Sequence, residues 1–209
     1  MARSNGGIIG KKNVTSFANH VSGQTVRTSD TPSAVTTQAG TRLIQTLIVA
    51  GGGGGGGYTA GGGAGGYRCV ETPVNGGAPY AITVGGGGAG SPTGPAQGTD
   101  GSDSVFSTLT STGGGGGAGD SAPTRDGRPG GSGGANGYIP GNPVLGCIGA
   151  GNTPPVSPPQ GFPSGNTNSD SATYTTGGGG GGASAVGGNA SCSGGATGGA
   201  GSTSDIKGS

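Results

Sequence analysis

The feature that most constrains this chain is an apolar segment that runs directly into a block of glycines. Residues 41–57 read TRLIQTLIVAGGGGGGG, so the apolar run Leu43–Val49 is followed, after one alanine, by seven consecutive glycines. Large and β-branched apolar residues are typical of a buried strand, whereas glycine weakens both strands and helices. The junction recurs three more times, most weakly in the last: 80–84 before Gly85–Gly88, 105–110 before Gly113–Gly117, and 172–176 before Gly177–Gly182. The sequence therefore predicts one unit, a short strand feeding a glycine run, used four times.

Composition limits the folds to which this unit can belong. The 209 residues include 59 glycines, hydrophobic residues make up only 27 %, and there is no tryptophan. Such a chain cannot bury enough side-chain surface for a large apolar core, and each ordered glycine loses more backbone entropy than any other residue. Chains rich in glycine and proline without a regular period are commonly disordered, and composition alone leaves that alternative open.

Glycine runs can be ordered if their backbones bond to one another. In the polyproline II conformation a chain has three residues per turn and no internal hydrogen bonds, so its N–H and C=O groups point sideways. Packed without side chains, neighbouring helices can pair these groups, and any Cβ atom would push them apart. Collagen is excluded because it needs glycine at every third position, whereas these runs are unbroken. Flexible linkers remain the alternative, although a linker needs no strand before each run.

We therefore predict an all-β fold with essentially no α-helix. A small antiparallel β-sandwich would feed a polyglycine II helical bundle that carries long Pro/Gly loops. No window shows the apolar spacing of three and four residues that marks a helix, and the Thr- and Val-rich pieces at 21–26 and 33–37 favour further short strands. This glycine-rich β/polyglycine II domain is expected to span residues 21–209.

Residues 1–20 differ in character and are predicted to form an extended attachment arm. The segment is too short to fold alone, and we expect it to dock on a partner, with a frayed terminus as the alternative. The docking side chains would be the basic and apolar ones that are scarce in the rest of the chain: Ile8, Ile9, Lys11, Lys12 and Phe17.

Four segments share a more specific pattern. They read LIVAGGGGGGG at 47–57, GGGAGGYR at 61–68, YAITVGGGGAG at 80–90 and GSDSVFSTLTSTGGGGGAG at 101–119. This pattern resembles the glycine-rich domain of bacteriophage tail and tail-fibre proteins. The resemblance implies a non-catalytic structural subunit of a virion, in a tail fibre, tail tip or similar appendage. It also implies other tail proteins as partners, a homo-oligomer, and no cofactor. The chain opens without a signal-peptide pattern, so we expect it to be made in the host cytoplasm and carried outside in the virion.

A receptor-binding adhesin at a tail-fibre tip is the alternative function. Two Pro- and Gly-rich stretches, 91–103 and 127–171, are expected to be exposed loops that contact the host surface. Within the second, Tyr138 is the candidate residue for stacking on a host glycan or packing against a host protein.

Catalysis, metal binding and nucleic-acid binding have little support. His20 is the single histidine, and residues 6–12 depart from the phosphate-binding loop pattern, so no catalytic residue is assigned. Asp100 and Asp103 begin a Ca²⁺-loop-like series that does not continue. A net charge of +1 gives no basic stripe for nucleic acid, and no apolar run is long enough to span a membrane. The three widely spaced cysteines fit neither a disulfide framework nor a zinc site and are expected to be small buried thiols.

Overall fold

All regular secondary structure in the described part of the chain is β-strand. The computed structural model describes residues 33–57, 59–92, 95–120, 123–137, 146–167, 176–191, 194–204 and 206. These residues contain six strands and no helix, which confirms the predicted all-β class for this part of the chain. The described residues from 33 to 204 belong to one unit.

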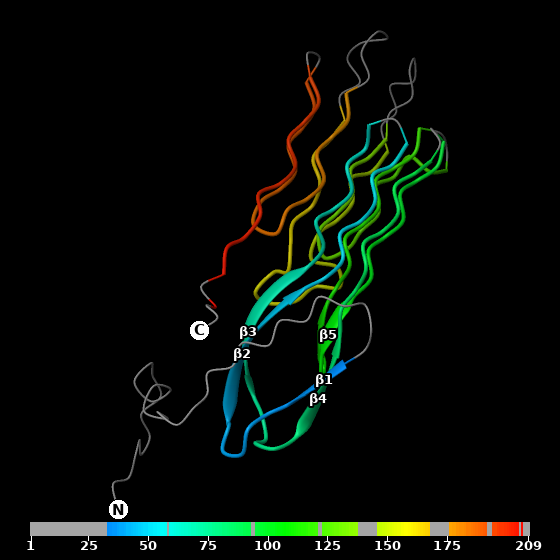
Figure 1. The fold of residues 1–209 in the computed structure, drawn as a ribbon. Helices are drawn as coiled ribbons and strands as arrows, with labels where there is room; N and C mark the ends of the chain where they lie inside the picture. The colour runs from blue at the N-terminus through cyan, green and yellow to red at the C-terminus, as the bar shows by residue number, and fades with distance from the viewer. Residues whose placement is uncertain are drawn as a thin grey trace, which may run out of the picture. The chain divides into compact units, whose positions relative to one another are not determined.

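The strands form two antiparallel sheets, one of four strands and one of two (Figure 1). The four-stranded sheet has the order β1-β4-β5-β6 and is built from β1 (Ser33–Thr36), β4 (Pro79–Thr83), β5 (Ser104–Phe106) and β6 (Leu109–Ser111). The smaller sheet pairs β2 (Leu43–Val49) with β3 (Tyr67–Pro73) along their whole length.

β2 forms where the sequence predicts a strand, but its partner β3 was not predicted. β2 alternates in burial: Ile48 is 6 % exposed, whereas Leu47 and Val49 on the opposite face are 40 % and 50 % exposed. β3 reads YRCVETP and lacks an apolar run, so its own sequence gives only a weak strand signal. β3 is therefore held in a strand conformation by its hydrogen bonds to β2 rather than by its own sequence.

The strand expected at 105–110 is in fact a tight hairpin. β5 ends at Phe106, β6 begins at Leu109, and these two residues lie opposite each other. Ser107, in the turn, has a φ of 55°, in the left-handed region that tight turns use. The chain therefore reverses here before it enters the next glycine run.

The two sheets contact each other through a few specific side chains. The Arg68 guanidinium of β3 donates a hydrogen bond of 2.7 Å to the Thr110 carbonyl of β6. Within the larger sheet, the rings of Tyr80 and Phe106 stack with centroids 5.7 Å apart, and Phe106 is 7 % exposed. Apolar packing is thus concentrated around the strands.

Beyond the strands, extended glycine-rich segments lie side by side and bond through their backbones (Figure 1). In the 50–57 run, the N–H groups of Gly53 and Gly56 donate to the 60–63 segment, at 2.8 Å each. Those of Gly51, Gly54 and Gly57 donate to the 96–102 segment at 3.0, 2.9 and 3.0 Å. Each neighbour is therefore met at every third residue, whereas the residues of a β-strand face a given side with period two.

Close contact between these segments explains why they consist of glycine. A Cβ atom at Gly54 would lie 2.0 Å from the carbonyl oxygen of Ala89, and one at Gly116 would lie 2.0 Å from that of Gly98. Main-chain atoms form both sides of these contacts, so no flexible side chain can move away. At Gly55, by contrast, the nearest atom would be 3.6 Å away, an ordinary contact.

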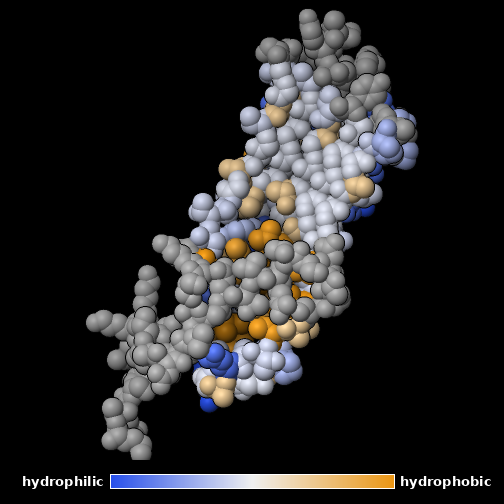
Figure 2. Space-filling model, in the orientation of Figure 1, coloured by the Kyte–Doolittle hydropathy of each residue, from blue (hydrophilic) through white to orange (hydrophobic). Residues whose placement is uncertain are grey.

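The interior of the glycine-rich part contains methyl groups and backbone rather than large apolar side chains. Its buried hydrophobic cluster consists of Ala60, Ala118 and Ala135, at 4 %, 0 % and 0 % exposure. Figure 2 agrees with this distribution: the visible surface of the glycine-rich part is mostly pale, and the strongest orange lies over the strands.

Two carboxylates of exposed residues accept hydrogen bonds from this backbone network. Asp103 accepts from the N–H of Gly113 at 2.8 Å, and Asp100 accepts from that of Gly116 at 2.9 Å. Both the acceptors and the donors are three residues apart, so one row of N–H groups bonds to side chains instead of carbonyls. Asp100 also binds Arg128 in a bidentate pair, with Nε–Oδ1 at 2.6 Å and Nη2–Oδ2 at 2.5 Å.

The expectation that 127–171 is an exposed loop is only partly met in its described parts: 154–155 and 157–159 are exposed, whereas other parts are buried. Residues 130–137 are buried, and Gly131, Gly133 and Ala135 donate backbone hydrogen bonds to other segments. Gln160 is completely buried, and its side chain accepts from the Thr112 N–H at 2.8 Å and donates to the Pro154 carbonyl at 3.0 Å. The burial of Gln160 is offset by these bonds to backbone groups, whereas the buried Ser164 hydroxyl has no partner in the described structure.

Alanine substitutions at adjacent glycines should have opposite effects. Gly54→Ala forces a Cβ into the Ala89 carbonyl and should destabilise the fold by about 1–3 kcal/mol. Gly55→Ala meets no such contact and should be neutral or stabilise by up to about 1 kcal/mol, because the unfolded chain loses freedom. Thermal unfolding monitored by circular dichroism measures both. Equal midpoints for the two variants would contradict the close packing at Gly54.

The Asp100–Arg128 pair should make stability depend on acid pH. Partial burial raises the pKa of Asp100, but hydrogen bonds from Arg128 and Gly116, with the charge of Arg128, lower that pKa below its ordinary value overall. The contribution is therefore present above the unfolded pKa of about 3.9 and is lost as the pH falls through the lower folded pKa. Asp100→Asn should flatten this acid limb, and Arg128→Gln should reduce it.

Urea unfolding at a series of pH values between about 2 and about 6 measures this limb. The Arg128 side chain is 46 % exposed and that of Asp100 is 37 % exposed. Because solvent screens such a pair, either substitution should lower the free energy of unfolding at neutral pH by no more than about 1 kcal/mol. An acid limb in Asp100→Asn as steep as in the wild type would show that other carboxylates are responsible.

Candidate functional site

None of the residues singled out from the sequence as docking or receptor contacts is placed by the structure. The arm residues Ile8, Ile9, Lys11, Lys12 and Phe17, and the loop residue Tyr138, all lie outside the described residues. Their roles stay predictions. The structure instead shows two surfaces: one is formed partly by the predicted 91–103 and 127–171 stretches, and the other was not indicated by the sequence.

The first surface is the end of the glycine-rich segments at which they reverse direction away from the sheets, here named the loop end. Neighbouring turns contact each other there: the Gly57 N–H donates to Ala96 at 3.0 Å, and the Thr124 hydroxyl donates to Pro95 at 2.7 Å. The Gly137 N–H donates to Arg125 at 2.8 Å. Segments that are distant in sequence therefore meet at the loop end.

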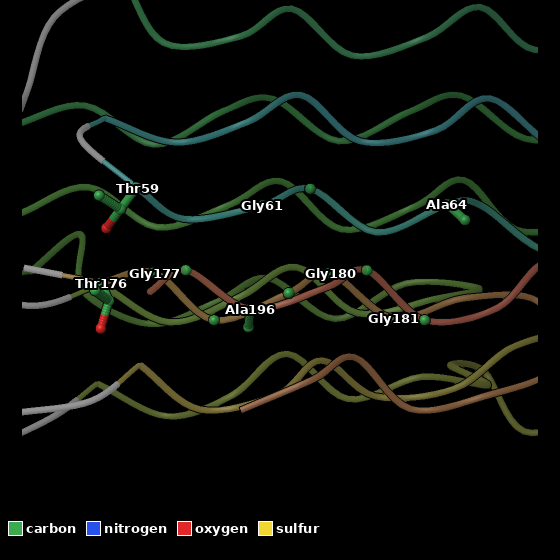
Figure 3. Close-up of a pocket in the computed structure, with 14 residues that line it drawn as sticks. Thr59, Gly61, Ala64, Thr176, Gly177, Gly180, Gly181 and Ala196 are labelled. Atoms are coloured by element: carbon green, nitrogen blue, oxygen red, sulfur yellow. The ribbon is translucent and has the colours of Figure 1, made fainter. Parts of the chain in front are cut away.

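The second surface is an open groove of about 590 Å³ between three glycine-rich segments. Its walls come from Thr59–Ala64, Thr176–Gly181 and Gly195–Gly199. Figure 3 shows the side chains of Thr59 and Thr176 at one end, with their hydroxyl groups pointing to the same side, and Ala64 toward the other end. The segments on the two sides are connected by hydrogen bonds at the groove floor, such as Ala64 N–H to Gly181 at 3.0 Å.

The groove offers hydrogen bonding but no acid–base chemistry. Among the described residues, those that line it are Gly, Ala and Thr, which present backbone groups, methyl groups and two hydroxyls and no ionisable side chain. The Thr176 hydroxyl already donates to the Ser191 carbonyl at 2.8 Å. In the sequence, the available signal is weak: Thr176 directly precedes a glycine run, whereas Thr59 lies between Tyr58 and Ala60 in the short break between two runs.

A smaller cleft of about 190 Å³ lies beside β3. Tyr67, Arg68 and Cys69 line it, opposite Pro158 and Pro159. Its polar groups are already engaged, since the Tyr67 hydroxyl donates to the Thr203 carbonyl at 2.9 Å and Arg68 bonds to Thr110. The cleft is smaller than the roughly 300–1,000 Å³ of typical small-molecule pockets.

The described cysteines only partly match the expectation of small buried thiols. Cys69 and Cys147 are both free, but Cys147 is exposed and Cys69 is only half-buried. Cys192 lies outside the described residues. In the part of the chain that the structure covers, no three His, Cys, Asp or Glu side chains gather as a metal site, and no helix could span a membrane.

Comparison with known proteins places the chain in a family. No curated protein and no solved structure matched it. A family model described as a glycine-rich domain matches residues 27–209, a range that includes all six strands and the glycine-rich segments that follow them. The chain therefore belongs to the glycine-rich domain family.

Proposed function

We propose that this chain is a non-catalytic structural subunit of a bacteriophage virion, in a tail fibre, tail tip or similar appendage. The observation that carries the proposal is the three-residue repeat of backbone hydrogen bonds between glycine runs. It supports an ordered, load-resisting scaffold over the flexible-linker alternative. The resemblance of 47–57, 61–68, 80–90 and 101–119 to phage tail glycine-rich domains supplies the setting.

In this proposal the runs are polyglycine II helices packed as a bundle. A repeat of three matches the three residues per turn of that conformation. The 112–119 run supports it further: the N–H groups of Gly114 and Gly117 donate to the 51–54 segment, and those of Gly115 and Ala118 to the 132–135 segment. The sheets would pack as a small β-sandwich, supported by the Arg68–Thr110 hydrogen bond between them.

Such a bundle suits an appendage because its rigidity does not depend on a wide apolar core. Each run bonds to several neighbours, so bending one run would break hydrogen bonds with all of them. Buried peptide groups are costly to leave without partners, which resists local opening. The proposed partners are other tail proteins and further copies of the chain, bound through the 1–20 arm, and the proposed location is the virion.

Deleting residues 1–20 from the gene in the virus that encodes the chain should remove the protein from particles. The arm would attach the subunit, and the glycine-rich domain should fold without it. Mass spectrometry of purified particles measures incorporation, and circular dichroism of the isolated variant checks that its β-structure remains. Absence of even the wild-type chain from particles would contradict the virion proposal. Normal incorporation of the folded deletion variant would contradict only the role of the arm.

A receptor-binding adhesin is the second candidate function. It is favoured by the meeting of distant turns at the loop end, where the Gly57–Ala96, Thr124–Pro95 and Gly137–Arg125 hydrogen bonds lie. Sequence stretches 138–145 and 168–175, which begin and end at described segments of the bundle, would supply the contact residues, with Tyr138 as the aromatic candidate. The host partner would be a surface glycan or protein.

Replacing 138–145 by an equally long Gly/Ser segment should abolish host binding while particles remain intact. The reason is that aromatic residues dominate such contacts, and Tyr138 would be lost. Adsorption of particles to host cells is the measurement. Val186→Ser is a control outside this stretch, since its side chain is 52 % exposed and is therefore expected to tolerate the change. Unchanged adsorption in the 138–145 variant would leave the purely structural role.

A further inference from the structure

Two Asn–Gly dipeptides in the described part of the chain lie in opposite environments. Asn75–Gly76 occupies the exposed turn between β3 and β4, whereas Asn136–Gly137 is inside the glycine-rich bundle. A third, Asn5–Gly6, lies outside the described residues. We propose that Asn75 is a site of spontaneous deamidation in the folded protein and that the fold protects Asn136 from the same reaction.

The reaction needs only the dipeptide and solvent. The backbone nitrogen of the following residue attacks Cγ of the asparagine, and glycine permits this because it has no Cβ to obstruct the approach. A C–N bond forms, the Cγ–Nδ2 bond breaks, and ammonia leaves with the proton of the glycine nitrogen. Water then opens the resulting succinimide ring at either carbonyl. The net change is asparagine plus water to aspartate or isoaspartate plus ammonia.

At Asn75 the two reacting groups are free. Both Asn75 and Gly76 are exposed, and in the described structure neither the Asn75 carboxamide nor the Gly76 N–H forms a hydrogen bond. The surrounding backbone is held in place, since the Asn75 N–H donates to the Tyr80 hydroxyl at 2.7 Å and its carbonyl accepts from Thr37 at 2.7 Å. The dipeptide is therefore open to solvent, and ring closure at Asn75 has to rotate only this surface turn.

At Asn136 both reacting groups are engaged. The side chain is completely buried, its Nδ2 donates to the Gly146 carbonyl at 2.7 Å, and its Oδ1 accepts from the Thr167 N–H at 2.9 Å. The nitrogen that would attack, that of Gly137, donates to the Arg125 carbonyl at 2.8 Å. Reaction there requires local unfolding that breaks all three hydrogen bonds.

Deamidation at Asn75 would act on the connection between the two sheets. Its turn joins β3 of one sheet to β4 of the other, and Thr37, just after β1, bonds to it through both the Asn75 carbonyl and the Gly77 N–H. Isoaspartate adds a methylene to the main chain and a carboxylate to the surface at this point. The Thr37 contacts are the ones that the lengthened backbone displaces.

Incubating the folded full-length protein at mildly alkaline pH, beside a sample held in denaturant, tests the proposal. Asn75 is the single asparagine of tryptic peptide 69–125, whereas peptide 126–207 contains six, so fragment-ion sequencing of that peptide assigns its mass increase to Asn136 or to another site. We expect the folded protein to deamidate at Asn75 about tenfold or more faster than at Asn136, a ratio equivalent to about 1.4 kcal/mol of protection. In denaturant the two sites should react at similar rates.

The variant Asn75→Gln provides the control, because the carboxamide it replaces makes no hydrogen bond in the described structure. It should fold with an unchanged unfolding midpoint and show no mass increase in peptide 69–125. Three results would overturn the proposal. They are an unreactive Asn75 in the folded wild type, an Asn136 that reacts as fast as Asn75 before denaturation, and a mass increase in peptide 69–125 that persists in Asn75→Gln.

Discussion

Hydrogen bonding between backbones that pack too closely to admit a Cβ atom is the interaction on which the rest of this structure depends. The largest completely buried side chains are Gln160, Asn136, Ser111, Ser132 and Ser164, all of them polar. Buried polar groups are tolerated when they have partners, and Gln160, Asn136 and Ser132 each bond to main-chain groups of other segments. The strands, the turns and these buried polar side chains are therefore arranged around a network of hydrogen bonds between peptide groups.

The sequence predicted the parts of this arrangement that local chemistry determines. β2 and β4 lie where short runs of apolar and β-branched residues precede glycine. Such a run indicates a strand by itself, without knowledge of its partner. β3 could not be predicted from the sequence, because YRCVETP has only a weak strand signal of its own and forms a strand by pairing with β2. Burial within 127–167 could not be predicted, because polar residues such as Asn136 and Gln160 are typical of exposed loops. Their burial depends on hydrogen bonds to backbone groups of other segments, which the sequence does not reveal.

The candidate site was less predictable than the fold for a related physical reason. The groove is made almost entirely of backbone, and a backbone surface leaves no side-chain pattern in the sequence. Only Thr59 and Thr176 contribute hydroxyl groups to it, and of the two only Thr176 directly precedes a glycine run. Asp100 and Asp103 show the converse, since a spacing that resembles the start of a metal loop serves to accept two N–H groups three residues apart.

The methyl-sized interior, with Ala60, Ala118 and Ala135 as its hydrophobic cluster, has a thermodynamic consequence. Unfolding most proteins exposes hydrocarbon, which raises the heat capacity, whereas exposed peptide groups lower it. Pulling glycine runs apart exposes mainly peptide groups, so the heat-capacity change per residue should be small. The curve of stability against temperature is then broad and shallow. A protein built in this way loses little of its stability on cooling, where proteins held together by apolar burial weaken.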